Sequence, residues 1–210
     1  KTGVVGLGAM GAGMAMNFHK AGHLHAVWNR TSSKAKIIAE QSGALHCDSP
    51  EQLATECDLI IICVSRDSDV MEMVQRIAHS VKPGDIVIDT STVSSDTAKQ
   101  AAAVLRNKQA HFLDCPVSGG SEGAVNGTLA MMVGGDEAIL ERARGHLAAI
   151  TKSIVHIGPT GSGQACKAVN QIICAGLYET VAEALSFGSA AGLDMEKVVK
   201  VVSGGAAANW

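Results

Sequence analysis

The sequence has few aromatic residues, few prolines and no concentrated charge. Aromatic residues make up 3% of the 210 residues and follow no pattern suited to stacking on bases. The formal net charge is -3 and no basic block is present, so we expect no nucleic-acid partner. Only 4 prolines, beside 47% hydrophobic residues, exclude a disordered chain and favour a globular protein with a large core.

Signals for metal binding and for membrane insertion are also missing. The 6 cysteines are scattered without a C-x-x-C pair, and the 8 histidines show no ligand spacing. We therefore expect reduced cysteines and no metal site. No apolar run approaches the length of a membrane span, and glycines interrupt the apolar N-terminal stretch, which lacks a cleavage-like site. We expect a cytoplasmic protein that does not bind a membrane.

Short apolar runs alternate with helical patterns over most of the chain, which is typical of an α/β fold around a parallel sheet. The expected strands cover residues 3–6, 25–28, 59–64, 86–89, 111–114, 130–133 and 153–156. The expected helices between them cover residues 11–20, 33–41, 68–77, 96–106 and 137–149. This alternation ends at residues 156–163. One long helix is then expected over 164–191, and its apolar composition predicts burial on several sides, between two domains.

A glycine motif follows the first expected strand and opens the first expected helix. Gly6 permits a tight turn, Gly8 lets the backbone approach a pyrophosphate, and Gly11 allows close packing of helix on strand. The motif consists of Gly6, Leu7, Gly8, Ala9, Met10 and Gly11. We therefore predict a doubly wound, Rossmann-type dinucleotide-binding domain over 1–160, followed by the start of an all-α domain over 161–210.

The end of the second expected strand indicates which dinucleotide is bound. An NAD enzyme carries Asp or Glu there for the ribose hydroxyls, whereas this chain has Asn29 followed by Arg30. Asn29 does not repel a 2′-phosphate, and Arg30 can clamp one with paired N–H donors. The alternative for Arg30 is an ordinary solvated loop arginine. The sequence favours NADP, with NAD also possible.

A glycine-rich turn after the expected strand 111–114 is a candidate anion site. The backbone N–H groups of Ser118, Gly119 and Gly120, with the serine hydroxyl, can form a nest for a carboxylate. The alternative is a plain turn.

Polar residues in the long helix are candidates for the chemistry. Gly163, Lys167, Asn170 and Cys174 share one helix face. Burial lowers the pKa of a lysine from about 10.4, so that it can donate a proton to a carbonyl oxygen and withdraw it in reverse. The alternative is a lysine whose ammonium reaches solvent at the domain edge.

Three segments together carry a resemblance to a known family. The motif 6–11, the stretch Asp114-Cys115-Pro116-Val117-Ser118-Gly119-Gly120 and the stretch 161–170 occur in the order of the β-hydroxyacid dehydrogenases. That family includes 3-hydroxyisobutyrate dehydrogenase, tartronate semialdehyde reductase, glyoxylate/succinic semialdehyde reductases and 6-phosphogluconate dehydrogenase. The chain resembles it over nearly its whole length.

The resemblance implies a function and a set of roles. It implies an NADPH-preferring oxidoreductase that acts on a short 3-hydroxy acid or its semialdehyde. Lys167 is then the catalytic lysine, Asn170 a substrate ligand, and Ser118, Gly119 and Gly120 the ligands of the substrate carboxylate. It further places Asn29, Arg30, Thr31, Val64, Ser65 and Thr92 in the cofactor site. The 29–31 segment resembles that of the NADPH-preferring branches.

The resemblance also implies an assembly and a longer chain. We expect the all-α domain to bind substrate and to form a homodimer or homotetramer. Members continue for about another half-domain of helices, so we expect the sequence to be truncated after Trp210.

Two other functions stay open. A sugar-acid dehydrogenase of the 6-phosphogluconate type needs a phosphate site that the sequence does not reveal. A catalytically silent NADP-binding module needs no lysine, so the presence of Lys167 and Asn170 argues against it. Lys167 also argues against an imine reductase, which shares this fold and usually lacks that lysine.

Overall fold

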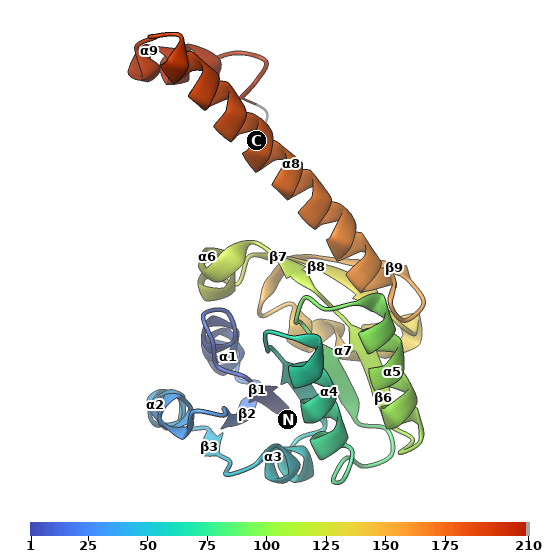
Figure 1. Cartoon of the computed structure of the whole chain (residues 1–210). Helices are drawn as coiled ribbons and strands as arrows, with labels where there is room; N and C mark the ends of the chain where they lie inside the picture. Colours follow the sequence, from blue (N-terminus) through green and yellow to red (C-terminus); the bar gives the residue numbers. More distant parts are fainter. Residues whose placement is uncertain (209–210) are drawn as a thin grey trace. The chain divides into compact units, whose positions relative to one another are not determined.

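A sheet lies at the centre of the first of two compact units (Figure 1), which cover residues 1–167 and the described residues from 168 onward. The computed structural model describes residues 1–208. The strand order is β3-β2-β1-β4-β5-β6-β8-β7, with β9 beside β8. The strands are β1 (Thr2–Val5), β2 (Leu24–Trp28), β3 (Leu45–His46), β4 (Leu59–Ile62), β5 (Ile86–Asp89), β6 (His111–Asp114), β7 (Val117–Ser118), β8 (Leu129–Gly134) and β9 (Thr151–Gly158).

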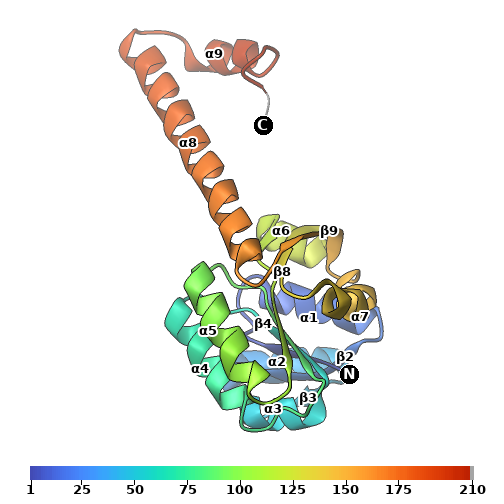
Figure 2. The ribbon, with the colours of Figure 1, turned by 90° about the vertical axis from the view of Figure 1, so that its right-hand side faces the viewer.

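Helices cover both faces of this sheet (Figure 2). Strands β1, β4 and β5 consist of buried residues, as expected for parallel strands that are covered on two sides. One apolar core joins the sheet to α1 and α7, and the other joins it to α3, α4 and α5. The helices are α1 (Gly11–Lys20), α2 (Ser32–Ser42), α3 (Pro50–Glu56), α4 (Asp67–Ile77), α5 (Ser95–Arg106), α6 (Gly120–Asn126), α7 (Glu137–Leu147), α8 (Ser162–Ala190) and α9 (Met195–Val202).

The doubly wound fold predicted from the sequence is confirmed. The parallel order β3-β2-β1-β4-β5-β6 is the dinucleotide-binding order, and it brings the carboxyl ends of β1 and β4 side by side. The sheet is not wholly parallel, however, because β8 pairs antiparallel with β6 and β7.

Within residues 1–208, no helix is both long and apolar enough to cross a membrane.

The long helix α8 begins in the first unit and continues into the second. In the second unit most of its side chains are exposed, including Ile172 at 72% and Phe187 at 73%. The expectation that this helix is buried on several sides is therefore wrong for that part of the structure. Helix α9 starts after Asp194, whose carboxylate accepts the N–H groups of Glu196 and Lys197. The domain ranges 1–160 and 161–210 stay a prediction, and residues 209–210 of the second lie outside the described residues.

Candidate functional site

The glycine motif forms a tight turn between β1 and α1. Gly6 has a φ of +93°, and a Cβ there would overlap the carbonyl oxygen of Cys63 on the neighbouring strand's end. A Cβ at Gly11 would overlap the carbonyl oxygen of Gly6, so α1 packs tightly on the turn. A Cβ at Gly8 would meet no atom within 4 Å. Gly8 is thus the position where a ligand can approach the backbone closely.

Asn29 connects this turn to the end of β2. Its Oδ1 accepts the Leu7 N–H at 2.8 Å, and its Nδ2 donates to the Thr31 carbonyl oxygen at 3.0 Å. A carboxylate at this position could accept from Leu7 but could not donate to Thr31. Asn29 therefore fixes the glycine turn to the segment after β2 without adding a negative charge.

An open cleft lies between the glycine turn, the end of β2 and the start of α4. Its volume is about 220 Å³, below the roughly 300 Å³ of a drug-sized pocket, so it suits part of a dinucleotide rather than all of one. The lining residues are Gly6, Gly8, Trp28, Asn29, Arg30, Thr31, Lys34, Cys63, Val64, Ser65, Asp69, Glu72 and Met73.

Seven residues predicted for the cofactor site therefore lie together, and five do not line this cleft. The seven are Gly6, Gly8, Asn29, Arg30, Thr31, Val64 and Ser65. Leu7 is buried and contributes its N–H to Asn29, whereas Gly11 packs under the turn. Ala9 is exposed and Met10 is half-buried at the start of α1. Thr92 is exposed in the loop after β5.

Charges of both signs face the cleft. Arg30 lies in the loop after β2 and Lys34 on the first turn of α2, whereas Asp69 and Glu72 lie on α4. Arg30 Nη1 lies 3.6 Å from Asp69 Oδ1. The arginine side chain is 81% exposed and the aspartate side chain 22%, so the pair lies at the rim of the cleft.

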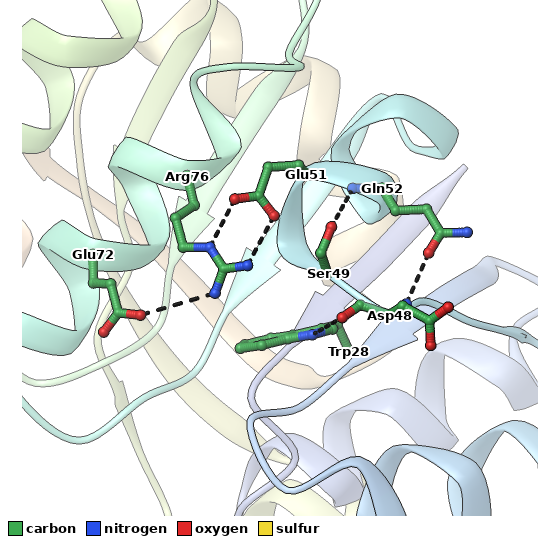
Figure 3. A network of polar contacts seen from close by, with 7 residues as sticks. All are labelled: Trp28, Asp48, Ser49, Glu51, Gln52, Glu72 and Arg76. Carbon is green, nitrogen blue, oxygen red and sulfur yellow. Dashed lines mark hydrogen bonds and ion pairs between the residues drawn. The ribbon is translucent and has the colours of Figure 1, made fainter.

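A polar network supports the wall formed by Trp28 and Glu72 (Figure 3). Glu51 on α3 accepts two hydrogen bonds from Arg76 on α4, at 2.7 and 3.0 Å, and these hold the pKa of Glu51 at about 2. The Arg76 guanidinium lies 5.6 Å from the Trp28 ring centroid and 3.9 Å from a Glu72 carboxylate oxygen. Trp28 Nε1 donates to the Asp48 carbonyl oxygen at 3.3 Å. The network fixes α3 and α4 against the end of β2.

The loop after β5 is held from two sides. Ser91 Oγ accepts the Val64 N–H at 2.9 Å, and the Ser91 N–H donates to Asp89 Oδ1 at 2.9 Å. On the other side, Gln164 of α8 donates to the Ser91 carbonyl oxygen at 2.9 Å and accepts the Val93 N–H at 3.1 Å. Thr92 lies between the anchored residues Ser91 and Val93.

Asp114 positions the beginning of α8. Its carboxylate is fully buried and accepts the N–H groups of Gly161 at 2.8 Å and Gln164 at 3.0 Å. Burial raises the pKa of Asp114, although these backbone N–H groups oppose the shift. A carboxylate at a helix N-terminus is stabilised by the unpaired N–H groups there. Asp114 therefore sets the direction of the helix turn that carries Lys167.

Lys167 is buried, at 8% exposure, one turn after this cap. A Cβ at Gly163 would approach the carbonyl oxygens of Asp114 and Met132, at 2.5 and 2.7 Å, so only glycine lets α8 come this close to β6 and β8. Asn170 lies one turn beyond Lys167, in the second unit, where its Nδ2 donates to Gln171 Oε1 at 3.0 Å.

The predicted carboxylate site lies where β7 ends. Ser118 pairs with Ala130 on β8 and is half-buried. The segment after it is not an open turn, because α6 begins at Gly120. Gly119 and Gly120 both have positive φ, at 134° and 61°, and both are exposed. Gly120 has open space where a Cβ would be. The two glycine N–H groups at this helix start are suited to an anion.

Sequence reasoning did not assign roles to several residues that organise these sites. Asp69 and Glu72 line the cleft, and Asp89, Asp114 and Gln164 hold the loops. A usable signal existed for Asp114, because a carboxylate that ends a buried strand just before a glycine turn needs partners.

Among residues 1–208, no group of three or more His, Cys, Asp or Glu side chains is placed to hold a metal ion.

Comparisons with known proteins agree with this geometry. Residues 1–158 match the model of the NAD binding domain of 6-phosphogluconate dehydrogenase. Residues 161–210 match the NAD-binding domain of NADP-dependent 3-hydroxyisobutyrate dehydrogenase. An uncharacterized oxidoreductase from Shewanella frigidimarina is 41% identical over 100% of this chain and 73% of its own. The chain belongs to the β-hydroxyacid dehydrogenase family.

Two further relatives illustrate the match. The 2-hydroxy-3-oxopropionate reductase of Escherichia coli is 36% identical over 100% of this chain and 72% of its own. The solved structure of Mycobacterium tuberculosis 3-hydroxyisobutyrate dehydrogenase with L-serine has a TM-score of 0.90 and 32% identity. It covers 98% of this chain, and the match covers 70% of that structure.

This β-hydroxyacid dehydrogenase is thus an NAD(P)-dependent oxidoreductase that acts on a CH–OH group. Its residues fit a nicotinamide dinucleotide, since Gly8 leaves the backbone open for a pyrophosphate and the N-terminus of α1 adjoins it. Arg30 and Lys34 at the β2 side of the cleft suit the adenosine end.

Proposed function

We propose that this enzyme transfers hydride between NADPH, in preference to NADH, and a short 3-hydroxy acid or its semialdehyde, with Lys167 as general acid and base. The observation that carries the proposal is the burial of Lys167 on the α8 turn that Asp114 and Gln164 anchor. An ammonium is costly to bury, so a buried lysine on a helix turn that is itself fixed in place favours a catalytic role over that of an ordinary surface lysine. A substrate class is suggested by relatives named for 3-hydroxyisobutyrate and 2-hydroxy-3-oxopropionate.

A nicotinamide dinucleotide held at the glycine turn would supply the hydride for the proposed reduction of the substrate carbonyl. Lys167 gives a proton to the carbonyl oxygen as negative charge develops there, and takes it back in the oxidation. Asn170, one helical turn away, holds the same oxygen. The N–H groups of Ser118, Gly119 and Gly120 bind the substrate carboxylate and orient the carbonyl.

Lys167→Ala tests the acid–base role. We expect turnover of glyoxylate, succinic semialdehyde, methylmalonate semialdehyde and tartronate semialdehyde to be lost, by about 100-fold or more, because proton transfer contributes roughly that much. NADPH affinity should change little, since Lys167 is not among the residues that line the cleft. Lys152→Ala, an exposed lysine on β9, is the matched control. Near-normal turnover in Lys167→Ala would remove the lysine from the mechanism, while tight NADPH binding without turnover in the parent would favour a silent binding module.

Arg30→Ala tests the cofactor preference. We expect weaker binding of NADPH, by about 10-fold or more, and little change for NADH, because only NADPH carries the 2′-phosphate that a guanidinium pairs with. Nicotinamide fluorescence titrations of the parent and the variant give the dissociation constants for NADPH and for NADH. Equal losses for the two cofactors would show that Arg30 does not recognise the phosphate.

We also propose that the enzyme is a homodimer or homotetramer that assembles through its helical part. Support comes from the exposed apolar side chains of α8 and α9, among them Ile172, Phe187 and Val201. Apolar side chains exposed in such numbers on two neighbouring helices are typical of an association surface.

A further inference from the structure

We propose that Asp69 sets how strongly the enzyme prefers NADP(H) over NAD(H), because its carboxylate competes with the cofactor's 2′-phosphate for Arg30. This inference rests on the proposed NADPH preference and names a residue that limits it. Asp69 lies on α4, on the opposite side of the cleft from the 29–31 segment.

The geometry makes Asp69 the existing partner of Arg30. The distance of 3.6 Å between Arg30 Nη1 and Asp69 Oδ1 is an ion-pair distance. Asp69 is on the first turn of a helix and only 22% exposed, whereas Arg30 is on a loop and 81% exposed. The carboxylate is therefore held in place, and the arginine side chain has the freedom to change partner.

The charges in the cleft make this competition matter. Arg30 and Lys34 contribute two positive charges, and Asp69 and Glu72 contribute two negative charges, so the four side chains sum to zero. A phosphate monoester near neutral pH carries about -1.5 to -2 charges and three acceptor oxygens, so it can displace a single carboxylate from a guanidinium. That displacement breaks the Arg30–Asp69 pair.

The cost of breaking the pair applies to one cofactor only. The 2′-hydroxyl of NADH is uncharged and leaves the Arg30–Asp69 pair intact. Asp69 therefore weakens NADP(H) binding selectively, by the strength of a rim ion pair, which corresponds to about two- to fivefold in affinity.

Asp69→Asn tests the proposal in the full chain, with NADPH and NADH as the probes and nicotinamide fluorescence as the readout. We expect the Kd for NADPH to fall by about two- to fivefold and the Kd for NADH to stay constant. Glu141→Gln is the matched control, because it removes one negative charge from the α7 ion pair with Arg144, outside the cleft. Equal tightening in Glu141→Gln would assign the effect to net charge and overturn the proposal.

A double-mutant cycle separates competition for Arg30 from simple repulsion. In an Arg30→Ala background, Asp69→Asn should no longer tighten NADPH binding. A gain that persists there, or weaker NADPH binding in Asp69→Asn itself, would overturn the proposal. Asp69→Ser provides a second substitution on the first turn of α4, and unfolding midpoints verify that both variants fold.

The same data separate the proposed NADPH preference from the proposed role of Asp69. If Arg30→Ala weakens NADPH and NADH equally, the proposed NADPH preference fails whatever Asp69 does. If Arg30→Ala is selective and Asp69→Asn changes neither Kd, only the role of Asp69 fails.

Discussion

At the scale of single residues, Asp89 combines deep burial with an incomplete set of partners. It ends β5 with no exposed surface, and its Oδ1 accepts the Ser91 N–H while its Oδ2 has no hydrogen-bond partner. Burial raises the pKa of Asp89 from 3.8 to about 7, and the neighbouring Asp114 adds to the shift. The folded protein therefore holds a proton that the unfolded chain has released over this pH range.

This difference predicts how stability depends on pH. Between pH 3.8 and about 7 the native state binds more protons at Asp89 than the unfolded state, so the Asp89 contribution to stability falls as pH rises. Below 3.8 and above about 7 that contribution is constant. Asp89→Asn removes it, so the variant should gain stability relative to the parent as pH increases from 4 to 7, by at most about 1.4 kcal/mol per pH unit.

Urea unfolding of both proteins at several pH values measures that difference. Asp96→Asn is the matched control, because Asp96 is on α5 with its side chain 83% exposed. Parallel pH profiles for the parent and Asp89→Asn would show that Asp89 has the same pKa in the folded and the unfolded protein, which would contradict the prediction.

At the scale of elements, the sequence predicted what strong periodicity encodes. Strands β5 and β6 and helix α1 were predicted at their observed bounds, because a buried apolar run or an apolar helix face specifies them locally. Strands β3 and β7 have two residues each, too few to show a period. Helix α3 was missed although Ser49 caps it and Pro50 occupies its first turn, which are recognisable start signals.

The candidate site was predictable only on one side of the cleft. The glycine turn and residues 29–31 follow strands, so their positions at the carboxyl edge come from the fold alone. Asp69, Glu72 and Arg76 come from α4, and a helical pattern does not reveal which polar residues face a neighbouring element. The burial of α8 was overestimated for a related reason, since an apolar helix shows that it needs a partner without showing where one is.

At the scale of the whole molecule, the two units differ in what stabilises them. The first contains both apolar cores and the cofactor cleft. In the second, α9 has no buried residue among those described, and α8 exposes Ile172 and Phe187. Helices of this kind gain little from their own packing and are stable mainly when another surface covers them.

Hydrogen exchange of the full chain at two protein concentrations, about 100-fold apart, tests whether a second copy provides that surface. We expect protection of β1, β4 and β5 to be independent of concentration, because burial within one chain protects them. Protection of α9 and of α8 after residue 168 should increase with concentration. Ile172→Asp should abolish that increase, whereas Ile37→Asp, at an apolar α2 position that is 53% exposed, should not. Concentration-independent exchange in both helices of the parent would contradict assembly through this surface.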